Sequence, residues 1–167
     1  MAGLEALGTS ELGPLVAQLT VRDAAAAIDF YRRVFAADEL YRNTEAGGSR
    51  IVHCELLMCG ARIVVHDEFP EFGLLGPQAI GGQSISLNLY VDDAEAVHSR
   101  ALAAGATLVS SPTLHFWGAV SGAFLDPFGH RWIVSTQVED PSPEEIIRRS
   151  RQAPAHGRLS AATKPAE

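Results

Sequence analysis

Three side chains that can transfer protons or bind a metal ion lie near the middle of the chain. His53 and Glu55 are separated by one residue, and His66 follows after a short turn. Two histidines and a carboxylate are a known ligand set for iron or zinc, and Glu55 or His66 could also act as a general base without a metal ion. In a third interpretation, Glu55 forms a structural ion pair with Arg62 or Arg131. The residue types alone leave all three interpretations open.

The residues around these side chains predict a hairpin of two antiparallel strands. If Cys59 and Gly60 form a two-residue turn, His53 lies opposite His66, and Glu55 shares their face of the sheet. The opposite face is then wholly apolar, and we expect it to pack against helices. Its members are Val52, Cys54, Leu56, Met58, Ile63 and Val65.

An internal repeat extends this pattern along the chain. The motif VRDAxAA at 21–27 recurs as VDDAxAV at 91–97, an offset of 70 residues. The motif LxxxGxRxV at 56–64 recurs as LxxxGxRxI at 125–133, an offset of 69 residues. In both modules an Asp in the position of a helix N-cap follows an alternating segment and precedes an Ala-rich one. The repeat therefore predicts two modules, each with a strand, a helix and three further strands.

We expect an α+β fold of two tandem βαβββ modules. Strands are predicted at about 15–21, 38–43, 49–58 and 61–67, and again at 84–91, 107–111, 118–125 and 131–137. Residues 1–14 form a lead-in, module one covers 15–67, module two covers 84–138, and 139–167 form a polar, partly disordered tail with a short helix. The connecting segment 68–83 contains Phe69, Phe72 and Leu74, which suits a lid over a ligand. We expect His98 on the solvent side of the second helix.

Strand alternation predicts that the face carrying His53 and Glu55 lines a pocket. Solvated faces are usually rich in Lys and Glu, whereas this face has neutral hydrogen-bonding groups among apolar side chains, as small-molecule pockets do. The predicted turn at 115–118 adds aromatic rings on which a flat apolar ligand could stack. The candidate ligand-binding residues are Gln18, Ser86, Asn88, Phe116, Trp117, Phe124 and Ser135.

Composition excludes several classes of function. The 13 Lys and Arg residues are outnumbered by 20 Asp and Glu residues, for a net charge of −7, so we expect no nucleic-acid partner. The apolar runs are far shorter than the ~18 residues that cross a membrane, and we expect no membrane partner. The two cysteines are too few for a disulfide framework. These features predict a cytoplasmic location.

Segments in both modules resemble the vicinal oxygen chelate superfamily, in particular its glyoxalase/bleomycin-resistance group. The resemblance covers about residues 15–138, and its most specific parts are AIDFYRRVFAA in module one and DPFGH in module two. It implies that the paired βαβββ modules curl into a cup-shaped, half-open barrel with the ligand inside. It also implies a homodimer.

The same resemblance bears on metal binding. Metal-dependent members carry up to four His, Gln or Glu ligands on the first and last strands of each module. In this chain the matching positions are Val16, Val64, Ser86 and Ile133, and a slip of two residues selects Gln18, His66, Asn88 and Ser135. Neither set offers more than one strong ligand. We therefore favour no metal or other cofactor, with His53, Glu55 and His66 as the fallback site for a divalent metal ion.

Two functional hypotheses follow for a small-molecule ligand. The first is a metal-free protein that binds and sequesters an antibiotic or another planar natural product. The alternative is an enzyme of the vicinal oxygen chelate type, with lyase, isomerase or dioxygenase-like activity in a biosynthetic or detoxification pathway. In that case His53, Glu55 and His66 would supply the catalytic or metal-binding groups.

Overall fold

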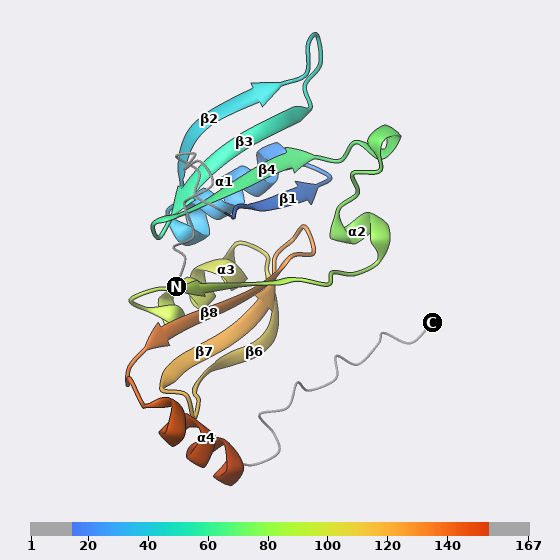
Figure 1. Ribbon diagram of the computed structural model, residues 1–167. Helices are drawn as coiled ribbons and strands as arrows, with labels where there is room; N and C mark the ends of the chain where they lie inside the picture. Colours follow the sequence, from blue (N-terminus) through green and yellow to red (C-terminus); the bar gives the residue numbers. More distant parts are fainter. Residues whose placement is uncertain (1–14, 154–167) are drawn as a thin grey trace, which may run out of the picture. The chain divides into compact units, whose positions relative to one another are not determined.

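The computed structural model describes residues 15–153, and the chain divides into two compact units between Gln83 and Ser84 (Figure 1). The division falls at the predicted start of module two. We use module one for the first unit, with its connecting segment, and module two for the second. The predicted lead-in at 1–14 and the predicted disordered end of the tail at 154–167 lie outside the described residues.

Module one is a four-stranded mixed sheet with a helix on one face. Its strands have the order β1-β4-β3-β2, in which β1 is parallel to β4 and the other pairs are antiparallel. The helix lies behind the sheet in the view of Figure 1, and its apolar side chains form the core with the alternate residues of the strands. The elements are β1 (Ala17–Val21), α1 (Ala24–Phe35), β2 (Asp38–Thr44), β3 (Ile51–Met58) and β4 (Ala61–Asp67).

Helix α1 begins where the sequence predicts it. The Asp23 side chain accepts a hydrogen bond from the Ala26 N–H over 2.9 Å, as an N-cap residue does. The buried Asp67 carboxylate also accepts hydrogen bonds from the N–H groups of Ala24, at 2.8 Å, and Ile51, at 2.6 Å. One side chain at the end of β4 therefore fixes both the first turn of α1 and the start of β3.

The predicted hairpin register is confirmed. Glu55 pairs with Val64, and both turn residues have positive φ, 48° at Cys59 and 77° at Gly60. The prediction for Val52 is wrong, because its side chain is 41% exposed and does not belong to the apolar face. The register shift between β2 and β3 leaves Val52 as an extra, unpaired residue of a β-bulge, which breaks the strand alternation at this point.

The connecting segment is more ordered than a plain linker. It contains a 3-10 turn, η1 (Pro70–Phe72), and a one-turn helix, α2 (Pro77–Ile80), and an isolated bridge pairs Phe69 with Leu74. The Glu68 carboxylate accepts a hydrogen bond from the Gly76 N–H over 2.9 Å. A side chain at Gly76 would lie 2.6 Å from the carbonyl oxygen of Thr20, so this glycine allows the segment to approach β1 closely.

Module two repeats the architecture, with the strand order β5-β8-β7-β6. Leu15 and Ile85 precede the first strands of their modules and are exposed, so these two strands begin later than predicted. Within residues 15–153, no helix has both the length and the apolar character needed to span a membrane. The elements are β5 (Ser86–Tyr90), α3 (Ala94–Ala103), β6 (Thr107–Leu114), β7 (Ala119–Leu125), β8 (Arg131–Gln137) and α4 (Pro143–Gln152).

The DPFGH segment forms the turn between β7 and β8. Asp126 accepts hydrogen bonds from the N–H groups of Phe128 and His130 and from the Trp132 indole, each over 2.9 Å. This turn is longer than the Cys59-Gly60 turn of module one, and the strand register differs as a result. Phe124 pairs with Trp132, where the repeat had placed it opposite Ile133.

The structure of module two corrects two predictions, one of them through the shifted register. A one-residue change in pairing moves every side chain of a strand to the other face. Phe124 therefore faces α3, fully buried, and is not on the predicted ligand face. Its ring meets that of His98 edge-on, with the centroids 5.2 Å apart, and His98 is only 3% exposed and does not face solvent as expected.

Candidate functional site

A cavity of about 440 Å³ lies in module one. Gln18 and His66 alternate with Leu19 and Val65, which are buried in the core, so they face away from α1. The connecting segment provides the opposing wall. The volume falls in the range of small-molecule pockets. The lining residues are Gln18, Glu45, Arg50, Val52, His66, Phe69, Glu71, Phe72 and Leu74.

His66 is a fixed part of the cavity. Its Nδ1 lies 2.7 Å from the carbonyl oxygen of Asp67, and its Nε2 lies 3.0 Å from the hydroxyl oxygen of Thr20. An imidazole that donates from Nδ1 and accepts at Nε2 satisfies both contacts. Both ring nitrogens are therefore engaged within the protein, and His66 is poorly placed to accept a proton from a ligand.

The connecting segment contributes apolar surface to the cavity. The Phe69 ring is buried, and its centroid lies 6.4 Å from the centroids of both the His66 and the Phe72 rings. The Phe72 side chain is 76% exposed, although it lines the cavity. Such an exposed ring beside a cavity can bury apolar surface when a ligand binds.

A cluster of three charged side chains completes the lining. One Arg50 Nη atom lies 2.8 Å from a carboxylate oxygen of Glu45 and 2.9 Å from one of Glu71. The guanidinium carbon of Arg50 is 4.3 Å from the centroid of the Phe69 ring. The hydrogen bond from Arg50 lowers the pKa of Glu71. Arg50 thus joins the loop between β2 and β3 to the connecting segment.

His53 and Glu55 lie together, but outside this cavity. The His53 Nε2 atom and an Arg62 Nη atom lie 3.3 Å and 3.2 Å from the Glu55 carboxylate. Burial alone would raise the pKa of Glu55, but hydrogen bonds from His53, Tyr41 and Arg62 lower it. The interpretation of Glu55 as part of an ion pair with Arg62 is therefore the one that this geometry supports.

Residues 15–153 contain no cluster of acidic, His and Cys side chains suited to chelating a metal ion. In the described part of the chain, no three His, Cys, Asp or Glu side chains are placed so that they could hold one, and this includes the fallback set of His53, Glu55 and His66. Of the positions carried over from the resemblance, Val16, Val64 and Ile133 offer no donor atom. The metal-site interpretation therefore has no supporting ligand geometry, and we derive no chemistry from it.

The candidate residues of module two form two groups. Ser86 and Asn88 are exposed on β5, and the buried Ser135 hydroxyl donates to Ser121 Oγ over 2.9 Å and lies 3.5 Å from Asn88 Oδ1. Phe116 and Trp117 lie in the turn between β6 and β7, half-buried. The Trp117 ring is stacked on the neighbouring His115 ring at 4.1 Å. One face of Trp117 is thus already occupied.

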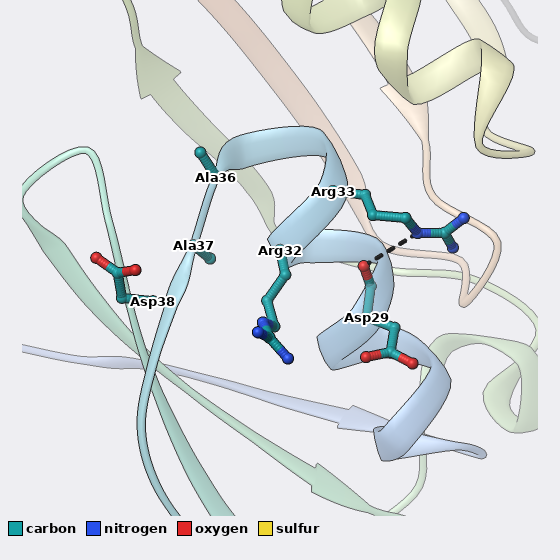
Figure 2. A pocket seen from close by; sticks show the side chains of 6 residues that line it. All are labelled: Asp29, Arg32, Arg33, Ala36, Ala37 and Asp38. Carbon is teal, nitrogen blue, oxygen red and sulfur yellow. Dashed lines mark hydrogen bonds between the residues drawn. The ribbon is translucent and has the colours of Figure 1, made fainter.

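A second, more open depression of about 720 Å³ lies at the C-terminal end of α1 (Figure 2). Its charged side chains are Asp29, Arg32, Arg33 and Asp38, and Arg33 donates from Nε to the carbonyl oxygen of Asp29 over 3.2 Å. The lining contains no aromatic ring and mixes both signs of charge. It therefore lacks the features that mark the first cavity as a ligand site.

Sequence reasoning missed four contributors to the cavity, Val52, Glu45, Arg50 and Glu71. Val52 was assigned to the wrong face because a β-bulge leaves no clear trace in the residue pattern. Glu45 and Arg50 were overlooked because they flank a Gly-rich turn, where charged residues are usually solvated. The sequence offered one signal for this ion-pair cluster. Residues of opposite charge occur on the two segments that meet at the cavity, Glu45 and Arg50 on the β2–β3 loop and Glu71 on the connecting segment.

Comparison with known proteins supports a single family. The model of the Glyoxalase/Bleomycin resistance protein/Dioxygenase superfamily matches residues 13–134. An uncharacterized protein of Mycobacterium tuberculosis is 37% identical over 131 residues, which cover 77% of this chain and 76% of that protein. An uncharacterized protein of Mycobacterium bovis has the same identity and length of match, covering 86% of that protein.

Solved structures share the fold. TioX from Micromonospora sp. ML1 is 26% identical with a TM-score of 0.58, over 74% of this chain and 98% of that chain. The fosfomycin resistance protein FosX from Listeria monocytogenes, solved with Mn(II) and sulfate, has a TM-score of 0.57 over 83% of this chain and 97% of that chain. At 16% identity its likeness concerns the fold alone. The match along both modules and the mycobacterial relatives establish that the chain belongs to the Glyoxalase/Bleomycin resistance protein/Dioxygenase superfamily.

Proposed function

We propose that this chain binds a small, flat, largely apolar molecule in the cavity of module one, without the help of a metal ion. The observation that carries the proposal is the composition of that cavity. The Gln18 amide can donate and accept hydrogen bonds on one side, and the Phe69 and Phe72 rings offer apolar surface on the other. A few polar groups among aromatic side chains are typical of sites that bind organic molecules.

The state of the titratable groups supports binding without turnover. His66 is hydrogen-bonded at both ring nitrogens, and Glu45 and Glu71 are paired with Arg50. General bases need an accessible lone pair directed at the proton that they remove. The alternative, an enzyme that uses His53 and Glu55, is less well supported because Arg62 and His53 hold the Glu55 carboxylate.

The family gives this binding a biological context. Its description includes bleomycin resistance proteins, and we propose sequestration of an antibiotic or another planar natural product as the role of this chain. We also propose a homodimer, which light scattering on the full chain would test.

Calorimetric titration with a panel of planar heteroaromatic compounds tests the proposal. Phe72→Ala should weaken the binding of any ligand found by about ten- to a hundredfold, because a buried aromatic side chain contributes roughly 1.5–3 kcal/mol. Ile80→Ala is the matched control, since Ile80 is an exposed apolar residue of the same segment and does not line the cavity. Affinity should be unchanged after treatment with EDTA.

Two results would contradict the proposal. One is the absence of binding by every planar compound in the panel. The other is a ligand whose affinity is the same for Phe72→Ala as for the unmodified chain, because that ligand must bind elsewhere. Loss of affinity on treatment with EDTA would contradict the metal-free part of the proposal alone.

A further inference from the structure

The side chain of Arg50 already forms, within the protein, the contacts that a planar cation would make in the cavity. Its guanidinium lies over the Phe69 ring at 4.3 Å and pairs with carboxylate oxygens of Glu45 and Glu71 at 2.8 Å and 2.9 Å. A flat cation over an aromatic ring is attracted by the negative face of that ring. The surroundings of Arg50 are therefore complementary to a flat, positively charged group.

The charges of the lining residues favour cations over anions. Glu45 and Glu71 together outnumber the single guanidinium of Arg50. An anionic ligand could reach Arg50 only by displacing a carboxylate that is already hydrogen-bonded to it. A cation would share Glu71 with Arg50, but because Glu45 also pairs with Arg50, the half-exposed Glu71 side chain can turn to the cation without leaving Arg50 unpaired.

From this arrangement we infer that the ligand class of the cavity is the planar organic cation, such as a heteroaromatic ring that carries an amine. The ring would stack beside Phe69 and Phe72, and Glu71 would face the positive charge. This inference rests on the proposed binding function, because it specifies the ligand of the same cavity. It adds the sign of the ligand's charge. The neutral polar side chains predicted on the sheet face are compatible with ligands of either sign.

Three probes with one ring system and different charges test the inference. At pH 8, 9-aminoacridine is a cation, acridine is neutral and acridine-9-carboxylate is an anion. Fluorescence titration of the full chain at low salt should rank their affinities in that order, with the cation about tenfold tighter than the neutral ring. The preference should decrease as salt screens the exposed carboxylates.

Charge variants provide the decisive comparison. Glu71→Gln should remove the preference for the cation over acridine. The double variant E45Q/E71Q leaves Arg50 without these two partners and should bind acridine-9-carboxylate most tightly. Glu39→Gln is the matched control, because Glu39 also pairs with an arginine, Arg42 at 2.7 Å, but does not line the cavity. Its ranking of the probes should equal that of the unmodified chain.

The outcomes separate this inference from the proposed function. If no probe and no other planar compound binds, the proposed function fails. If the three probes bind with equal affinity and Phe72→Ala weakens all of them, the proposed function stands and the inferred charge preference is wrong. Tightest binding of the anion to the unmodified chain would also overturn the inference, because Arg50 would then be the ligand's partner.

Discussion

The backbone N–H of Ala24 donates a hydrogen bond to the Asp67 carboxylate over 2.8 Å, which joins the start of α1 to the end of β4. Module two has the corresponding bond at the repeat-related position, where the Ala94 N–H donates to the Thr136 hydroxyl over 2.8 Å. The two acceptors differ in capacity, because Asp67 also accepts from the Ile51 N–H. The repeat thus preserves the contact while its chemistry differs between the modules.

Asp67→Asn should destabilise the chain by ~3 kcal/mol, because one amide oxygen cannot serve two buried N–H donors that the carboxylate now satisfies. Thr136→Val should cost about 1–2 kcal/mol, since it leaves a single N–H without its acceptor. Urea unfolding followed by circular dichroism measures both changes. Asp23→Asn is the control, because asparagine is an equally good N-cap residue. Equal midpoints for Asp67→Asn and Asp23→Asn would contradict the assigned role of Asp67.

The repeat in the sequence was sufficient to predict the order of elements in both modules. Asp23 and Asp93 cap α1 and α3 as expected, and the Cys59-Gly60 turn has the predicted register. The error at Phe124 came from assuming that both hairpins have equally long turns. Turn length is a local property of each module: five residues, 126–130, connect β7 to β8, whereas two connect β3 to β4, and an odd difference in turn length reverses the faces of β7.

The candidate site was only partly predictable for a related reason. Alternation correctly placed Gln18 and His66 on the face away from α1, because regular strands have a period of two. It could not show that His66 lies in a different cluster from His53 and Glu55. The contact of Arg50 with Glu71 depends on how a connecting segment folds back, and no periodic pattern encodes that path.

The buried His98 should make the stability of module two depend on pH. Burial lowers the pKa of His98, and the backbone of Gly122 only partly opposes this effect. The unfolded chain, with an ordinary pKa of about 6.5, therefore binds a proton first as the pH falls, and stability is lost below that value. The slope cannot exceed about 1.4 kcal/mol per pH unit for one proton.

Urea unfolding at pH 8 and pH 5.5, followed by tryptophan fluorescence, tests this dependence. Both tryptophans, Trp117 and Trp132, lie in module two and report on its unfolding. His98→Leu should reduce the loss of stability between the two pH values, whereas His115→Gln, in the half-buried turn, should not. An unchanged pH dependence in His98→Leu would show that other groups cause it.

The two cysteines should differ in reactivity towards a thiol reagent. Burial raises the pKa of the Cys54 thiol to about 11, whereas Cys59 is exposed in the β3–β4 turn. Ellman's reagent at pH 8 should therefore modify Cys59 in the folded chain and reach Cys54 only in urea. Cys59→Ser should abolish the reaction of the folded chain, and rapid modification of both thiols without urea would contradict the buried position of Cys54.

We propose that a small molecule binds in the cavity of module one. The most direct test is a ¹H–¹⁵N correlation spectrum of the full chain, titrated with 9-aminoacridine. We expect the perturbed amides to belong to Gln18, Val52, His66, Phe69 and residues 71–74, which line the cavity or lie within its wall. Perturbations confined to the 115–118 turn or to β5 of module two, or no perturbation by any planar ligand, would contradict this proposal.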